Sequence, residues 1–219
     1  MSLRLGVLVS GSGSNLQSII DSSEKGFIKS KVCVVISNVP GVYALERAKK
    51  HNIPAIVINH KDFSTREDFD KAIVNKLKEF NIDLVIMAGF LRIITNVLLD
   101  AYPMKILNIH PALLPSFPGL HVQKKALDYG CKFAGCTVHF ADSGVDTGPI
   151  IIQGIVPVLD NDTEETLSKR ILSVEHKIYP QAIKLYEENR LKIIGRRVII
   201  EPPLSPEESV FLTNPLVEV

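Results

Sequence analysis

The stretch VLVSGSGSNLQSII, residues 7–20, joins an apolar run to a helical pattern through a turn that contains Gly11 and Gly13. The aliphatic and β-branched residues before the turn are typical of a buried strand, and the apolar spacing after it indicates a helix. Apolar runs and helical patterns alternate in the same way along most of the chain. This order predicts an α/β fold with a mostly parallel twisted sheet and helices on both faces.

The strand candidates are short apolar runs rich in β-branched residues. In α/β sheets of this kind ligands bind beyond the carboxyl ends of the strands, so a functional site is expected there. The predicted strands are residues 5–9, 32–36, 55–58, 84–87, 106–109, 136–140 and 150–158.

Two of the helical patterns begin with capping signals. Ser64 with Glu67, and Asp162 with Glu165, match capping boxes, in which the side chains at both positions bond the first-turn backbone. Apolar residues at helical spacing follow each box. Pro180 is expected to kink or end the second helix, because proline lacks the backbone donor that a helix interior needs.

The composition indicates a cytoplasmic protein with one large core. The chain has 219 residues, 46% of them hydrophobic, and a net charge of +1. We expect one domain over residues 1–198 and an irregular tail over residues 199–219. Three cysteines without paired spacing favour a reduced, cytoplasmic protein. The chain lacks the clustered basic residues that would predict nucleic-acid binding. None of its apolar runs is long enough to span a membrane. Monomer and homodimer both stay open.

The glycine-rich turn predicts an anion site. A helix that begins directly after it points unpaired N–H groups and the positive end of its dipole at a ligand above the turn. Ser12, Ser14 and Asn15 add hydroxyl and amide donors that suit a phosphate. A dinucleotide site would need a third glycine where the chain has Leu16, and an acid at the end of the next strand, where it has Asn38. A flexible turn without a ligand is the alternative.

The stretch KILNIHPALLPSFPG, residues 105–119, places Asn108 and His110 where a buried strand gives way to a proline-rich loop. Residues two apart on a strand face the same way. An amide beside an imidazole suits a reaction at a carbonyl, since the amide N–H can support an oxyanion and the imidazole can move a proton. Without a nucleophile elbow no covalent acyl-enzyme is suggested, and direct transfer between two bound substrates stays open. Two polar side chains that satisfy loop carbonyls are the alternative.

The stretch DSGVDTGPIII, residues 142–152, carries Asp146 ahead of a buried strand. One interpretation is a carboxylate that reaches His110, stabilises its charged form and fixes its orientation. The alternative is a turn in which Asp146 bonds its own backbone. Asp-Thr-Gly also occurs in aspartic proteases, but those need a second aspartate and an all-β scaffold. His139 is more typical of a hydrogen-bonded partner than of a ligand. No metal is expected from the histidine spacing, although a His/His/Asp site stays open.

Six stretches together resemble the folate-dependent formyltransferases. They run in the family's order across roughly residues 4–195: VLVSGSGSNLQSII, AGFLRII, LNIHPALLPSFPGLH, GCTVHF, VDTGPIIIQ and EHKIYPQAI. The resemblance implies a single Rossmann-like formyltransferase domain, with the phosphate loop in its N-terminal half and the folate and catalytic elements in the second. It also implies direct transfer of the formyl group of 10-formyltetrahydrofolate, a co-substrate, to the amine of glycinamide ribonucleotide in de novo purine biosynthesis, without a metal.

The resemblance also implies roles for individual residues. Asn108 would be the oxyanion donor, His110 the general acid, and Asp146 the carboxylate that stabilises the charged His110. The ribonucleotide would be held by Gly13, Ser14 and Asn15 at its phosphate and by Glu175 at its ribose hydroxyls. The folate would be held by Arg66, Leu91, Arg92, Ile93, Ile94, Asn108, Asp142, Ser143, Gly144, Val145 and Asp146.

Three rival functions are weighed against this one. A methionyl-tRNA formyltransferase should carry an additional basic C-terminal domain, and a formyltetrahydrofolate deformylase should carry an N-terminal regulatory domain. A non-catalytic phosphosugar-binding module would use the first loop alone. That last function would leave Asn108, His110 and Asp146 unexplained.

Overall fold

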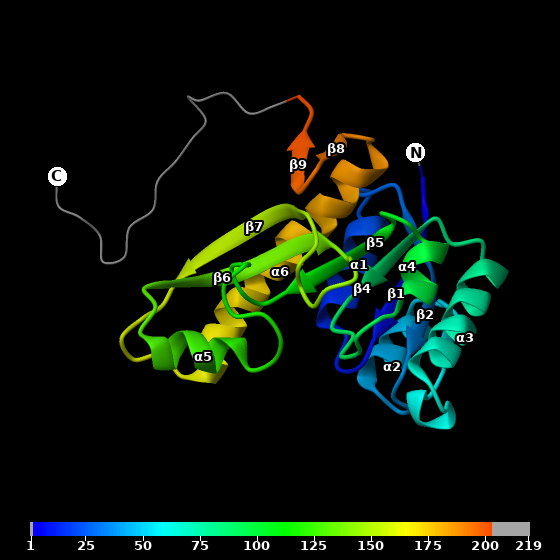
Figure 1. The fold of residues 1–219 in the computed structure, drawn as a ribbon, viewed down its shortest axis with the longest axis horizontal. Helices are drawn as coiled ribbons and strands as arrows, with labels where there is room; N and C mark the ends of the chain where they lie inside the picture. Colours follow the sequence, from blue (N-terminus) through cyan, green and yellow to red (C-terminus); the bar gives the residue numbers. More distant parts are fainter. Residues whose placement is uncertain (1, 203–219) are drawn as a thin grey trace.

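The computed structural model describes residues 2–202, and a nine-stranded sheet runs through this part of the chain (Figure 1). The strand order is β3-β2-β1-β4-β5-β6-β7-β9-β8. It reverses at β1, which lies between β2 and β4, so a ligand-binding crevice is expected at the carboxyl ends of β1 and β4. The strands are β1 (Arg4–Val9), β2 (Lys31–Ser37), β3 (Ala55–Val57), β4 (Leu84–Met87), β5 (Ile106–His110), β6 (Phe133–Phe140), β7 (Ile150–Pro157), β8 (Leu191–Ile194) and β9 (Arg197–Ile200).

The sheet is mostly parallel, as predicted. Strands β1 to β5 are all parallel to their neighbours within that group, and β9 joins β7 through one parallel pair. The pairs β5–β6, β6–β7 and β8–β9 are antiparallel. In the β5–β6 pair Asn108 lies opposite His139, and His110 lies opposite Thr137. Directly opposite residues share a face of the sheet, so this pairing brings a second histidine to Asn108.

Helices cover both faces of the sheet (Figure 1). Side chains of α1, α2 and α6 belong to the hydrophobic core on one face, and those of α3 and α4 to the core on the other. Helix α5 packs against α6 and shares a third cluster with β6 and β7. The helices are α1 (Ser14–Glu24), α2 (Tyr43–Lys50), α3 (Arg66–Glu79), α4 (Asn96–Ala101), α5 (Val122–Tyr129) and α6 (Glu164–Glu187), with a 3₁₀ turn at His60–Asp62.

Strand β1 serves both cores at once. Val7 and Val9 belong to the core beneath α1 and α6, whereas Leu8 belongs to the core beneath α3 and α4. Gly6 faces the second core, where a Cβ atom would lie 2.5 Å from a side-chain carbon of Leu77. Burial on both faces explains why the parallel strands appear in the sequence as continuous apolar runs instead of alternating ones.

The predicted cap of α3 is wrong by one residue. Thr65, not Ser64, is the N-cap residue, and its hydroxyl accepts a hydrogen bond from the backbone N–H of Asp68. Both residues carry a hydroxyl, and the extended backbone of Thr65 decides between them. The sequence signal therefore located the start of the helix but not its terminal residue.

The predicted cap of α6 is also wrong by one residue. Thr163 and Thr166 form the capping box in place of Asp162 and Glu165. The Asp162 carboxylate is drawn instead into a two-pronged ion pair with Arg170, at 2.6 and 2.8 Å. This pairing lowers the pKa of Asp162 strongly, with the Arg170 hydrogen bond as the first cause.

The C-terminal part of the described chain departs from the prediction in two ways. Helix α6 does not end at Pro180 but continues to Glu187, because the last turns pack Ala182 and Ile183 into the core. Strands β8 and β9 were not predicted, and the expected domain boundary after residue 198 falls within β9. Most of the expected tail, residues 203–219, lies outside the described residues. No helix within residues 2–202 is long and apolar enough to cross a membrane.

Candidate active site

A cavity of about 620 Å³ opens at the carboxyl ends of β4 and β5. Its volume is in the range of small-molecule sites. Met87 at the end of β4, Asn108 and His110 on β5, Asn15 on α1 and Glu175 on α6 all line it. The loop after β4, the loop after β5 and the loop between β6 and β7 complete its walls. The cavity is thus centred one strand away from the crevice that the strand order predicts and reaches toward it through Asn15 of α1, the helix that follows β1.

Most of the residues predicted for a site line this one cavity. Gly13, Ser14 and Ser143 lie on the same loops but do not reach its wall. The structure adds His139 from β6 and residues 119–123 from the loop before α5 and the first residues of that helix. The predicted residues in the wall are Asn15, Arg66, Leu91, Arg92, Ile93, Ile94, Asn108, His110, Asp142, Gly144, Val145, Asp146 and Glu175.

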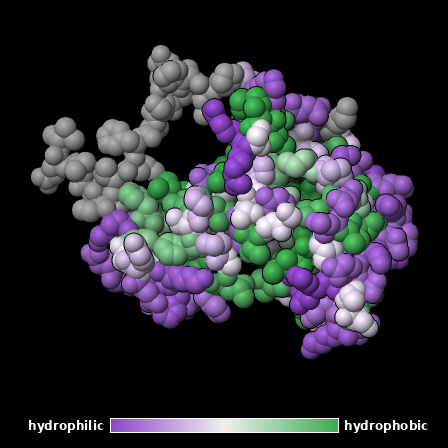
Figure 2. All heavy atoms as spheres, in the orientation of Figure 1, coloured by the Kyte–Doolittle hydropathy of each residue, from purple (hydrophilic) through white to green (hydrophobic). Residues whose placement is uncertain are grey.

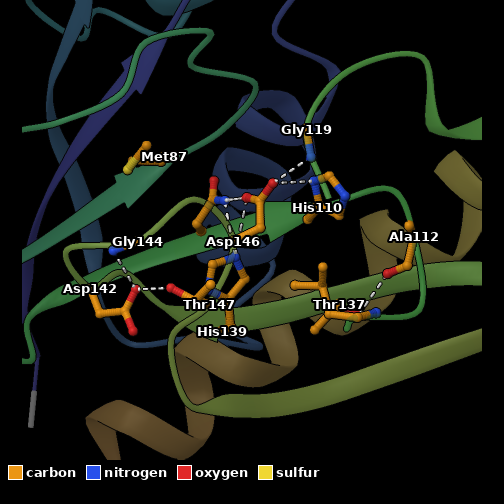
Figure 3. A network of polar contacts seen from close by, with 12 residues as sticks. Met87, His110, Ala112, Gly119, Thr137, His139, Asp142, Gly144, Asp146 and Thr147 are labelled. Carbon is orange, nitrogen blue, oxygen red and sulfur yellow. Dashed lines mark hydrogen bonds and ion pairs between the residues drawn. The ribbon is translucent and has the colours of Figure 1, made fainter. Parts of the chain in front are cut away.

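Asp146 and His110 meet in the wall of the cavity (Figure 3). Asp146 Oδ2 lies 3.3 Å from His110 Nδ1 and accepts a hydrogen bond from the Gly119 backbone N–H at 3.0 Å. His110 Nε2 lies 2.9 Å from the carbonyl oxygen of Phe117. Both ring nitrogens therefore face acceptors, an arrangement that a doubly protonated imidazole satisfies. The two side chains are only 6% and 12% exposed, so water screens the pair weakly.

Asn108 is held by a histidine that the sequence did not place in the site. Its Nδ2 lies 3.1 Å from His139 Nε2 and 3.4 Å from Asp146 Oδ1. His139 Nδ1 lies 2.8 Å from the Phe140 carbonyl, so Nδ1 carries the proton and Nε2 accepts from Asn108. Burial lowers the pKa of His139, which favours this neutral ring. The interpretation of His139 as a hydrogen-bonded partner is confirmed, but its place beside Asn108 depends on an antiparallel strand pair.

The two aspartates of the loop between β6 and β7, Asp142 and Asp146, make different contacts (Figure 3). Asp142 makes the turn that was considered for Asp146: its Oδ1 accepts from the Gly144 backbone N–H at 3.1 Å and from the Thr147 hydroxyl at 2.6 Å. Asp146 has a positive φ of 55°, a conformation that aspartate tolerates better than most residues. The turn at Asp142 thus fixes a loop from which Asp146 reaches His110.

The glycine-rich turn after β1, residues 11–15, is called the anion loop. It lies at the other end of the cavity, where Asn15 lines the wall. Gly13 precedes α1 with φ 73°, and no described side chain caps the first turn or places an acid in it. The Asn15 amide turns toward α6, where Nδ2 donates to Glu175 Oε2 at 2.7 Å. Asn15 Oδ1 is buried without a hydrogen-bond partner among the described residues. Burial raises the pKa of Glu175. This end of the cavity therefore offers an unpaired acceptor, Asn15 Oδ1, beside the Glu175 carboxyl group to a hydroxylated ligand.

An apolar rim borders the mouth of the cavity. Leu91 and Ile93 are 67% and 53% exposed, and Leu120 and Val145 are 62% and 46% exposed. Arg92 lies among them with a buried Nε that has no hydrogen-bond partner in the described chain. Figure 2 shows apolar side chains interspersed with polar ones on the face in view. Such a rim suits a ligand with a flat apolar body.

The histidines of the cavity are occupied by protein partners. Each ring nitrogen of His110 and His139 already faces an acceptor or a donor of the chain. Among the described residues, one group of three potential metal ligands, Asp21, Glu24 and His51, lies on α1 and the end of α2, outside the cavity wall. That the reaction needs no metal stays a prediction.

A cavity near the switch point of a mostly parallel sheet defines the class of α/β proteins that bind small molecules at this edge of the sheet. Residues 3–183 match the model of one family of that class, described as formyl transferase. The chain belongs to the formyl transferase family.

Two relatives of similar length resemble this chain over most of its residues. A glycinamide ribonucleotide transformylase 1 from Symbiobacterium toebii superposes with a TM-score of 0.90 at 51% identity, covering 91% of this chain and 94% of that one. The phosphoribosylglycinamide formyltransferase of Escherichia coli (strain K12) is 40% identical over 187 residues, which are 85% of this chain and 88% of that protein.

A longer relative shares the same region. The trifunctional purine biosynthetic protein adenosine-3 of Drosophila melanogaster is 44% identical over 206 residues. These residues are 93% of this chain but 15% of that protein. The chain therefore spans a small share of the length of this multifunctional relative, and its likeness extends to one part of it.

Proposed function

We propose that this protein is a phosphoribosylglycinamide formyltransferase, which transfers the formyl group of 10-formyltetrahydrofolate to the amine of glycinamide ribonucleotide. The observation that carries the proposal is the convergence of Asn108, His110 and Asp146 on one cavity with two different ends. One end has an uncapped helix N-terminus and a buried acceptor without a partner, Asn15 Oδ1, which suit a phosphosugar. The other has an apolar rim, which suits the ring system of a folate.

The reaction that we assign is a direct transfer. The amine nitrogen attacks the formyl carbon, the carbonyl oxygen becomes an oxyanion, and the bond between that carbon and folate N10 then breaks. The amine loses one proton and N10 gains one, so the protons balance. Charge develops on the formyl oxygen and on N10, and these are the atoms at which the protein has to stabilise charge or donate a proton.

Asn108 is the oxyanion donor in this mechanism. Both hydrogens of its amide have partners within the protein, His139 Nε2 at 3.1 Å and Asp146 Oδ1 at 3.4 Å. The longer bond is the weaker one and is the one that a developing oxyanion replaces. His139 keeps the amide oriented while this exchange takes place.

His110 is the general acid, and the ionised Asp146 stabilises its protonated form across 3.3 Å. Its Nε2 is covered by the Phe117 carbonyl, so proton donation to the substrate through Nε2 requires this contact to open. Phe117 has a φ of 52°, a left-handed conformation that costs a non-glycine residue about 1–3 kcal/mol.

Substrate binding follows from the same geometry. The phosphate binds at the Gly13–Ser14–Asn15 loop, and the ribose hydroxyls bind Glu175, whose carboxylate lies 2.7 Å from the Asn15 amide. The folate binds along the backbone of residues 91–94 and the loop of residues 142–146, with Arg66 exposed at the mouth of the cavity.

The test is an acceptor-selection assay. Purified protein is given 10-formyltetrahydrofolate with glycinamide ribonucleotide, initiator tRNA or water as the only acceptor. Formyl transfer to the ribonucleotide supports the proposal, and preferential transfer to tRNA or water contradicts it. A parallel sample treated exhaustively with a chelator should keep its rate, since no metal takes part in the mechanism. A rate that disappears and returns with added zinc would refute the mechanism.

A further inference from the structure

Ser10 lies between β1 and the anion loop, and its polar atoms bind another loop instead of the cavity. Its backbone N–H donates to the Gly89 carbonyl at 3.0 Å, and its hydroxyl accepts from the Leu91 backbone N–H at 2.8 Å. Ser10 does not line the cavity, whereas Gly89 and Leu91 do. The first residue before the anion loop thus holds two backbone groups of the loop after β4.

Asn38 gives the Ser10 hydroxyl its direction. The hydroxyl donates to Asn38 Oδ1 at 2.6 Å, which leaves its lone pairs for the Leu91 N–H. Asn38 is 2% exposed, and its Nδ2 lies 3.2 Å from Nδ1 of His60. Asn38 directly follows β2, where a dinucleotide-binding protein carries an acid for its ligand. Here the same position serves an internal hydrogen bond.

The segment of residues 91–94 is also held by residues of α3 at both of its ends. The backbone N–H of Thr95 donates to Asp70 Oδ2 at 2.6 Å, and Phe90 stacks on Phe69 with ring centroids 6.4 Å apart. Leu91 to Ile94 lie between these anchors and line the cavity. Asp70 and Phe69 belong to α3, so Ser10 is the anchor that connects this segment to the anion loop.

We propose that Ser10 is a positioning residue that couples the two substrate sites. An anion that orders the loop beginning at Gly11 also restrains Ser10, and through its hydroxyl the Leu91 N–H. A folate bound along residues 91–94 restrains the anion loop in turn, because coupling between two binding sites is reciprocal. The inference rests on the proposed function for the identity of the two ligands.

The experiment measures this coupling by calorimetry. Tetrahydrofolate carries no formyl group, so it binds beside glycinamide ribonucleotide without reacting. The dissociation constant of tetrahydrofolate is measured with and without saturating ribonucleotide, and the ratio of the two values is the coupling factor. Ser10→Ala should lower this factor about 2- to 10-fold, the effect of one hydrogen bond of ordinary strength. Ser10→Thr, which keeps the hydroxyl, should restore it.

A matched control and a second measurement isolate the role of Ser10. Ser22→Ala removes a hydroxyl that donates to the Ser18 carbonyl at 2.7 Å on α1, away from both loops, and should leave the coupling factor unchanged. In the wild-type protein, ribonucleotide alone should slow hydrogen exchange of the Leu91 amide. Equal coupling factors in wild type and Ser10→Ala, or a Leu91 amide that does not respond, would overturn the inference. Failure of wild-type protein to bind either substrate would instead refute the proposed function.

Discussion

At the scale of single residues, the site depends on a division of labour among polar side chains that look alike in the sequence. Asp142 and Asp146 are four residues apart, yet one closes a turn and the other reaches His110. His110 and His139 face the same cavity, but His139 is neutral because burial lowers its pKa, and it serves to orient Asn108. The chemistry of each group therefore depends on its partner more than on its residue type.

Asp146→Asn tests the pairing of Asp146 with His110. The substitution keeps the shape of the side chain and its acceptor for Gly119 but removes the charge that stabilises protonated His110. We expect turnover to fall by about 100-fold or more, the usual contribution of a general acid. The KM for the ribonucleotide should change little, since we assign its phosphate to the distant anion loop. Steady-state kinetics with each substrate varied in turn measure both effects.

Asp160→Asn is the control for this prediction. The Asp160 side chain is 98% exposed and pairs with Lys132 at the surface, so its neutralisation changes net charge without reaching the cavity. It should retain wild-type kinetics. Near-normal turnover in Asp146→Asn would mean that Asp146 is a turn residue without a catalytic role.

At the scale of elements, the sequence predicted buried strands better than exposed ones. The range 84–87 was predicted to the residue, because β4 is buried along its whole length. Strands β8 and β9 were missed because each has only four residues and is only partly buried, so its apolar stretch is too short to indicate a buried strand. The position of His139 beside Asn108 could not be predicted, since alternating strands and helices give no sign that β6 runs antiparallel to β5.

The anion loop gives a prediction at the same scale. Gly13 has φ 73°, and a Cβ there would lie 2.6 Å from the Ala44 Cβ and 2.8 Å from the Ala44 Cα on α2. Gly13→Ala should therefore lower the free energy of unfolding by about 1–3 kcal/mol, from backbone strain and from displacement of α2. A Cβ at Gly11 would meet no atom within 4 Å. Gly11→Ala should unfold at the same urea concentration as wild type.

Urea unfolding of the two variants decides whether Gly13 has a structural task. Equal stability of Gly13→Ala and Gly11→Ala would contradict the packing of the loop against α2. A loss confined to Gly13→Ala would mean that substitutions at this position change folding as well as ligand binding. Phosphate binding at the loop is then better tested with Ser14→Ala, since the Ser14 hydroxyl can be removed without a change of backbone conformation.

At the scale of the whole molecule, α6 contacts both the cavity and the central strands β4 and β5 of the sheet. It supplies Glu175 to the end of the cavity that Asn15 lines, and its fully buried Tyr179 hydroxyl lies 3.0 Å from the Met87 carbonyl and 2.9 Å from the Leu107 carbonyl. These carbonyls belong to β4 and β5, next to the residues that line the site. The same helix that stabilises the sheet thus sets the position of the strand ends, which links stability to the geometry of the site.

The pH dependence of stability follows from the buried histidines. Burial lowers the pKa of both His139 and His176 from an ordinary value of 6.5. Below about pH 6.5 the unfolded chain binds protons at these residues that the folded chain does not bind. The free energy of unfolding should therefore fall as the pH decreases from 7.5 to 5.5, with a limiting slope of about 1.4 kcal/mol per pH unit for each histidine. Glu175 and Asp70, whose pKa values are raised by burial, act with the opposite sign above pH 4.5 and 3.8, respectively.

Comparison of variants separates these opposing contributions. His139→Gln removes one of the two histidines and keeps an acceptor for Asn108, so its unfolding free energy should depend less steeply on pH between 7.5 and 5.5 than that of the wild type. His176→Gln should have the same effect, although His176 lies on helix α6 and His139 on strand β6. Urea unfolding at intervals of half a pH unit measures the slopes, with Glu175 and Asp70 present in every sample so that their contribution cancels. Parallel curves for wild type and His139→Gln would mean that His139 takes up a proton in the folded protein as readily as in the unfolded chain. The neutral ring that orients Asn108 would then be lost at mildly acidic pH, and the role assigned to His139 would have to be abandoned.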